Sequence, residues 1–153
     1  MGGYKLRKVN GVFIVLILLI ITGCSNKEVI NHNYIYKGEN ELWSAEYRVN
    51  GTGTFTEENG KTKYESNSNN ILIVTYKKEL SQLSSLKHLE ISYASSAGGG
   101  KITEDYTDGP PKEKTYTIKS GGNGVAIENK DEVINVTINF DGKIQIIELK
   151  DVN

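Results

Sequence analysis

The sequence predicts an all-β domain, built as an antiparallel β-sandwich or a partly open barrel with one short helical connector. From Tyr34 onward, apolar and polar residues alternate with a period of two, the period of a strand that buries one face. Short apolar segments recur between Asn-Gly and Asp-Gly pairs, which suit tight turns with positive φ. Many short strands at this spacing are typical of sandwiches and barrels.

The predicted strands follow one another along the chain. Segment 43–49 places Trp43, Ala45, Tyr47 and Val49 on one face and polar residues on the other. Segment 71–76 is a β-branched run that is typical of a buried strand. The other predicted strands are 88–93, 115–119, 124–128, 134–140 and 143–149. Turns are expected at Asn50-Gly51, Asn59-Gly60, Asn123-Gly124 and Asp141-Gly142.

The last two strands form the clearest predicted element, a hairpin around Asp141-Gly142. A two-residue turn sets the register, which pairs Phe140 with Lys143, Val136 with Ile147 and Ile134 with Leu149. In that register Ile144 and Ile146 face the other side of the hairpin. We therefore expect a bulge, or a second covered face, at this position.

One segment departs from the strand period. Leu80, Leu83, Leu86 and Leu89 recur every three residues, which is close to a helical or 3₁₀ repeat. The segment 79–86 is therefore predicted to form one or two helical turns between two strands.

The chain begins with a basic and then apolar leader. Lys5, Arg7 and Lys8 precede an apolar run at 12–21, which as a helix spans roughly 15 Å and is short for a bilayer core of about 30 Å. The following Ile21-Thr22-Gly23-Cys24 resembles the lipobox of bacterial lipoproteins. This resemblance implies cleavage between Gly23 and Cys24 and a diacylglyceryl group on the Cys24 thiol. An uncleaved membrane anchor and a buried core cysteine are the alternatives.

These features predict three parts: a signal peptide at 1–23, a lipidated polar tether at 24–33 and a β-sandwich domain at 34–153. The protein is expected on the extracytoplasmic face of the cell membrane, with the membrane as its first partner. Loss of residues 1–23 moves the formal net charge from −1 to −4, because three basic residues are removed, and this argues against nucleic-acid binding. The single cysteine leaves no disulfide or cysteine-built zinc site, and neither a metal nor a cofactor is expected.

A second resemblance concerns the folded part. The stretch Tyr34-Ile35-Tyr36-Lys37-Gly38-Glu39, followed by Trp43 and Tyr47, resembles the start of small, largely uncharacterised Gram-positive lipoprotein domains with a Gly-Glu-x-x-x-Trp stretch. The leucine-spaced connector, the segment 88–93 and the glycine-rich loop after it also resemble those domains. The resemblance implies a β-rich fold and an extracytoplasmic location, and it supplies no catalytic residue.

Few residues are candidates for catalysis. His32 falls in the predicted tether, and no Gly-x-Ser-x-Gly turn accompanies His88. Glu104, Asp105 and Asp108 lack the spacing of a calcium-binding EF-hand loop and favour a solvated acidic turn. We therefore expect no catalytic residue and no enzyme activity.

Aromatic residues are the best candidates for a binding surface. Tyr34, Tyr36, Trp43 and Tyr47 are close in sequence and are able to form a platform for a glycan or a protein. The competing interpretation places Trp43 and Tyr47 in the core and Tyr34 and Tyr36 at the edge of the sheet.

Together these observations favour a non-catalytic, membrane-anchored domain that binds a protein or a wall polymer. The alternatives are a wall-associated hydrolase that uses Glu104, Asp105 or Asp108, and a self-protection lipoprotein that intercepts a toxin or lytic enzyme.

Overall fold

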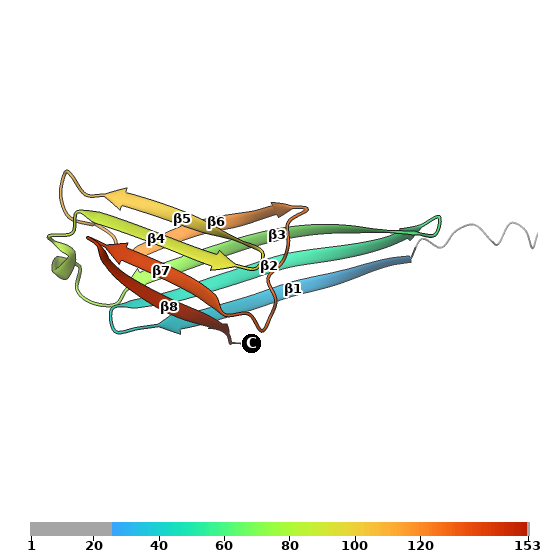
Figure 1. The fold of residues 1–153 in the computed structure, drawn as a ribbon, viewed down its shortest axis with the longest axis horizontal. Helices are drawn as coiled ribbons and strands as arrows, with labels where there is room; N and C mark the ends of the chain where they lie inside the picture. Colours follow the sequence, from blue (N-terminus) through green and yellow to red (C-terminus); the bar gives the residue numbers. More distant parts are fainter. Residues whose placement is uncertain (1–25, 153) are drawn as a thin grey trace, which may run out of the picture.

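A computed structural model describes residues 26–152 as one antiparallel sheet of eight strands that is nearly closed into a barrel (Figure 1). The all-β fold is confirmed, and the partly open barrel is the predicted alternative that it resembles. The leader and Cys24, on which the lipobox prediction rests, lie outside the described residues. The strands are β1 (Asn26–Glu39), β2 (Trp43–Glu58), β3 (Lys61–Tyr76), β4 (His88–Ser95), β5 (Gly98–Asp105), β6 (Thr115–Asn123), β7 (Ile134–Phe140) and β8 (Lys143–Asp151).

The order of strands around the sheet is β5-β4-β7-β8-β1-β2-β3-β6. Every neighbouring pair is antiparallel. Strands β5 and β6 stand at the two ends of this order and form the two free edges of the sheet. The two edges approach each other where Ile118 of β6 packs over Gly100 of β5. A Cβ atom on Gly100 would lie 2.8 Å from the Cγ2 atom of Ile118. Glycine is therefore required for this close approach.

The three longest strands, β1, β2 and β3, extend beyond the barrel as an arm, which comprises residues 26–31, 52–58 and 61–66 (Figure 1). The predicted tether at 24–33 is wrong for its described part, because residues 26–33 pair along their whole length with β2. Their side chains are mostly exposed on both faces, so no alternation of apolar residues marks them as a strand in the sequence. The arm is held by its backbone ladder instead.

The inner face of the sheet forms the core. Alternation along the strands turns large apolar side chains inward, and eleven of them are almost completely buried: Trp43, Tyr36, Tyr47, Leu72, Leu89, Ile91, Ile134, Ile138, Leu149, Val74 and Val136. The core is rich in aromatic contacts, with the ring of Trp43 centred 4.9 Å from that of Tyr76. The Nε1 atom of Trp43 is buried without a hydrogen-bond partner among the described residues.

A short helix closes one end of the barrel. The 3₁₀ helix η1 (Leu80–Leu83) confirms the helical connector predicted at 79–86. Leu83 and Leu86 are buried beside Trp43 because their spacing of three residues places both on the same side of the turn. No described helix is long and apolar enough to cross a membrane.

A loop of residues 124–133 closes the other end of the barrel. The strand predicted at 124–128 is wrong, because this segment crosses the inner face of β2 and β3 instead of joining the sheet. The Gly124 amide donates to the Ser66 carbonyl at 2.7 Å, and the Ser66 hydroxyl donates to the Val125 carbonyl at 2.6 Å. The predicted turn at Asn50-Gly51 is also wrong: both residues lie within β2, and Ile127 packs against Gly51.

The C-terminal hairpin is confirmed in its predicted register, including the pair Phe140–Lys143. The predicted turn residues Asp141 and Gly142 have φ of 49° and 82°, as a tight hairpin turn requires. The expected bulge is absent from the described ladder between β7 and β8, and no second layer covers the outer face. Ile144 and Ile146 are instead exposed on the outside of the barrel.

The register of β8 predicts opposite effects for two neighbouring isoleucines. Ile147 is 2% exposed and Ile146 is 61% exposed. Replacing Ile147 by alanine should lower the free energy of unfolding by about 2–5 kcal/mol, because it leaves a cavity in the core. Ile146→Ala, the matched control, should change it by less than about 0.5 kcal/mol. Urea denaturation measures both, and a larger loss for Ile146→Ala would mean that the strand is shifted by one residue.

Candidate functional site

The aromatic residues predicted as a binding surface are mainly part of the core. Tyr36, Trp43 and Tyr47 have no exposed surface, because all three point inward from β1 and β2. Tyr34 is half-buried, and its hydroxyl lies 2.8 Å from the Nδ1 atom of His32. The exposed platform is therefore wrong, and the competing interpretation holds for Trp43 and Tyr47.

A buried carboxyl group that the sequence analysis missed lies beside these tyrosines. Glu128 is 3% exposed, and the loop 124–133 carries it into the barrel. Its carboxyl group accepts hydrogen bonds from the hydroxyl of Tyr47 at 2.6 Å, the hydroxyl of Ser95 at 3.0 Å and the amide of Asn70 at 3.3 Å. These donors come from β2, β4 and β3, so Glu128 ties the loop to three strands. The only signal in the sequence is an acidic residue directly after the apolar Val125-Ala126-Ile127.

The Glu128 cluster predicts a defined loss of stability. Tyr47→Phe removes the hydroxyl that donates to Glu128, so the free energy of unfolding should fall by about 1–3 kcal/mol. Tyr64→Phe is the matched control, since Tyr64 lies half-exposed on the arm, and its effect should stay within about 0.5 kcal/mol. Equal effects of the two substitutions in chemical denaturation would contradict a structural role for the Tyr47 hydroxyl.

Burial raises the pKa of four tyrosines, and it does so most strongly at three of them. Desolvation is the main cause at Tyr36, Tyr47 and Tyr116, and the negative charge of Glu128 adds to it at Tyr36. The hydrogen bond to Glu128 raises the pKa of Tyr47 further, and the hydrogen bond to Tyr106 raises the pKa of Tyr116 further. All three phenols stay protonated in the folded protein at a pH where an exposed tyrosine ionises.

These raised pKa values predict unfolding by alkali. Below about pH 10, tyrosines are protonated in both the folded and the unfolded chain, and the stabilisation is fully present. Above that pH, the unfolded chain loses the protons that the folded chain retains. The free energy of unfolding should then fall by about 1.4 kcal/mol per pH unit for each such tyrosine. Tyrosinate absorbance and circular dichroism, recorded together, should show the buried phenols ionising only as the sheet unfolds. Ionisation of all tyrosines near pH 10 in an intact sheet would contradict this.

One cleft lies where the barrel remains open. It has a volume of about 620 Å³ and is lined by the end of β5, the start of β6 and the loop between them. Ile102 and Tyr116 form its apolar part, and the hydroxyls of Tyr106 and Tyr116 lie 3.1 Å apart. Both tyrosines have a raised pKa, mainly because of desolvation. The cleft is therefore a gap between two strand edges with a partly apolar floor.

The wall of the cleft is acidic. Four carboxylates line it (Glu104, Asp105, Asp108 and Glu113), with Lys112 as the one basic residue among the described lining. Glu104 and Asp105 are consecutive in β5, so their side chains point to opposite faces and do not converge on one substrate atom. No group of three or more metal-ligating side chains is arranged to hold a metal ion in residues 26–152. The arrangement suits electrostatic attraction of a cationic group.

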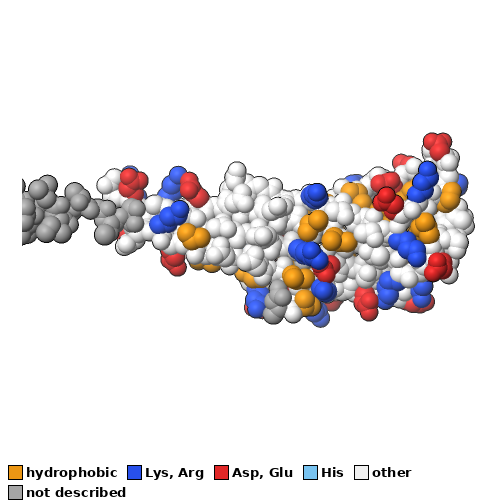
Figure 2. Space-filling view, turned by 180° about the vertical axis from the view of Figure 1, so that it is seen from behind, with side chains coloured by type: hydrophobic (Ala, Val, Ile, Leu, Met, Phe, Trp, Pro, Cys, Tyr) orange, Lys and Arg blue, Asp and Glu red, His pale blue; other side chains and the backbone are white. Residues whose placement is uncertain are grey.

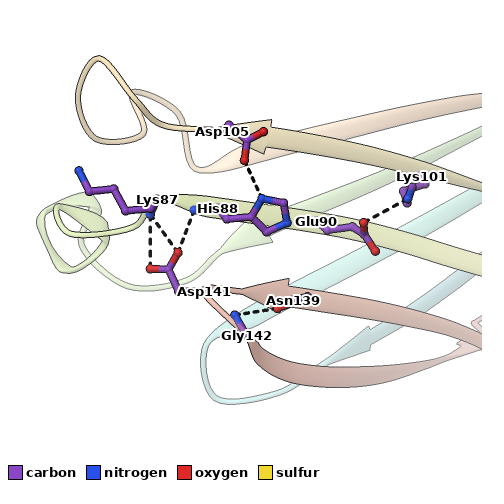
Figure 3. A network of polar contacts seen from close by, with 8 residues as sticks. All are labelled: Lys87, His88, Glu90, Lys101, Asp105, Asn139, Asp141 and Gly142. Atoms are coloured by element: carbon purple, nitrogen blue, oxygen red, sulfur yellow. Dashed lines mark hydrogen bonds and ion pairs between the residues drawn. The ribbon is translucent and has the colours of Figure 1, made fainter.

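A network of polar contacts on the outside of the barrel fixes this end of the sheet (Figure 3). The Nδ1 atom of His88 lies 2.6 Å from the Oδ1 atom of Asp105, which joins β4 to β5. The Asp141 carboxylate accepts the backbone amide of His88 at 2.8 Å and that of Lys87 at 3.1 Å, which joins the β7–β8 turn to β4. His88 and Asp105 are both exposed, so this pair adds little stability and mainly orients Asp105 at the edge of the cleft.

Comparison of the chain with models of protein families, with curated proteins and with solved structures found no match. The molecule has an arm at one end and an acidic cleft at the other.

Proposed function

We propose that the protein is a membrane-anchored extracytoplasmic lipoprotein whose barrel is a non-catalytic binding module. The observation that carries this proposal is the position of the N-terminal end of β1. Strand β1 begins with Asn26. Its first residues lie at the tip of the arm, and the end of β5 and the start of β6, which line the acidic cleft, lie at the opposite end of the molecule (Figure 1). A lipid at Cys24 would thus hold the arm at the membrane and direct the cleft away from it.

The distance between the expected lipid and the arm is short. Cys24 precedes Asn26 by two residues, which reach at most about 7 Å when fully extended. The part of β1 that lies in the arm, residues 26–31, extends over about 20 Å at roughly 3.3 Å per residue. Since β1 is paired with β2 throughout, this length acts as a stiff spacer in place of a flexible tether.

The charges on the arm favour attachment of the protein to the membrane through a lipid group over attachment through charged side chains of the arm. Basic and acidic side chains are interspersed there (Figure 2). Lys63 and Glu65, for example, form an ion pair at 2.6 Å. Such mixed charge gives no cluster of basic residues for anionic lipids, so membrane binding would depend on the diacylglyceryl group.

The partner that fits this proposal is a protein or a wall polymer within reach of the cleft. The cleft is lined by the end of β5 and the start of β6. These strand ends lie at the end of the barrel farthest from the arm tip (Figure 1). Because the arm sets its height above the bilayer, the barrel would sample a narrow layer just outside the membrane. This suits a partner that is itself confined to that layer.

A single substitution tests the anchor. Cys24→Ala removes the thiol that would form the thioether, so it should abolish labelling of the chain by a fatty-acid probe and leave the protein unprocessed or released. Ser25→Ala, the neighbouring control, should be labelled like the unchanged chain. Equal labelling of Cys24→Ala would rule out the lipid anchor.

The same cells test the binding role. A photo-crosslinking residue at Thr117, in the cleft, should capture one dominant partner, whereas the same residue at Ile146, on the outside of β8, should not. Equal capture at both positions, or none at either, would contradict binding of a protein through the cleft.

A further inference from the structure

The two free edges of the sheet face each other along a seam beside the cleft. Backbone groups of an antiparallel strand point alternately to its two neighbours. The Tyr106 amide donates to the Lys87 carbonyl and the Tyr76 amide donates to the Lys114 carbonyl, which fixes this alternation in both edge strands. It follows that Lys101, Thr103 and Asp105 of β5 direct their N–H and C=O groups into the seam. The matching residues of β6 are Thr115, Thr117 and Lys119.

Only side chains are described as bridging the seam. The hydroxyls of Tyr93 and Ser120 lie 2.6 Å apart near its middle, and those of Tyr106 and Tyr116 lie 3.1 Å apart near the cleft. In residues 26–152 no backbone ladder joins β5 to β6, whereas each of the other neighbouring pairs of strands has one. The edges therefore keep free donors and acceptors, at a spacing that repeats every second residue.

We propose that the seam binds an extended cationic peptide segment of a partner protein, which adds as a strand to the free edge of β6 at its cleft end, along Thr115 and Thr117. An edge with alternating donors and acceptors is matched by another peptide backbone, while a glycan lacks amides at this spacing. Thr115, Thr117 and Lys119 are exposed, so their side chains do not cover the edge. The inference rests on the proposed binding role, but it does not require the lipid anchor.

The charge of the cleft determines the kind of segment. Four carboxylates and one lysine line the end of the seam where β6 begins, so the segment should carry lysine or arginine there. The apolar floor at Ile102 and Tyr116 favours apolar residues at the alternate positions, which point inward from an added strand. An alternating basic and apolar peptide satisfies both requirements.

The probe that tests this inference is a synthetic eight-residue peptide of alternating lysine and valine, titrated into the full-length isotopically labelled chain in mild detergent. The amide signals of Thr115 and Thr117, which line the cleft, should shift and exchange more slowly with solvent when the peptide binds. Two control peptides change one property each. One has glutamate in place of lysine, and the other is N-methylated at alternate residues on its edge-facing side. Each should bind at least about tenfold more weakly.

Variants of the edge complete the test. Thr117→Pro removes a seam-facing N–H group that bonds to no other strand of the sheet. This substitution should weaken binding of the lysine–valine peptide at least about tenfold. Thr117→Val keeps the N–H group and should bind within about twofold of the unchanged chain. If Thr117→Pro unfolds, the N-methylated peptide still tests the edge without any change to the protein.

Three outcomes would overturn the inference: no binding of the lysine–valine peptide, unchanged binding of its N-methylated form, or equal binding of the glutamate form. Each leaves the proposed function open, because labelling of Cys24 and crosslinking in cells are measured separately. If a partner captured in cells binds the Thr117→Pro variant as well as the unchanged chain, the protein is a binding module but does not bind this partner through the seam.

Discussion

The closure of one antiparallel sheet around a single core is the constraint on which the rest of this structure depends. A sheet that covers its own apolar face needs no second layer, but its two ends and its last seam must still be closed. Leucines of η1 cover one end and the loop 124–133 covers the other. Within residues 26–152 the seam is bridged by side chains and not by a backbone ladder, which leaves two strand edges with free backbone groups.

The end covered by the loop 124–133 shows how a polar group is accommodated inside such a barrel. A buried carboxyl group is costly unless several donors satisfy it. Glu128 meets this requirement with donors from three strands, and in return these contacts fix the position of an irregular segment that has no ladder of its own. Buried polar residues of the inner face, such as Asn70, therefore help to hold the loop at this end of the barrel, whereas the opposite end is packed with apolar and aromatic side chains.

The molecule divides its proposed roles between its two ends. The arm consists of three paired strands without an apolar layer of its own, and its stiffness comes from continuous backbone hydrogen bonding. The cleft lies where the sheet fails to close, and Lys112 is the one basic residue among the described lining that faces the exposed carboxylates there. A spacer and an acidic opening at opposite ends are compatible with the proposed anchoring and binding roles.

The sequence by itself determined the class of fold, the C-terminal hairpin with its register and the helical connector. Each of these depends on contacts between residues that are close in the chain, where alternation and turn chemistry are decisive. Only the tertiary structure decided that residues 26–33 form a strand, that Glu128 is buried and that Ile146 is exposed. Tyr36, which was expected at the edge of the sheet or on a binding surface, is buried in the core for the same kind of reason. Burial is set by what packs against a strand, and closure of the sheet brings those partners from distant parts of the chain.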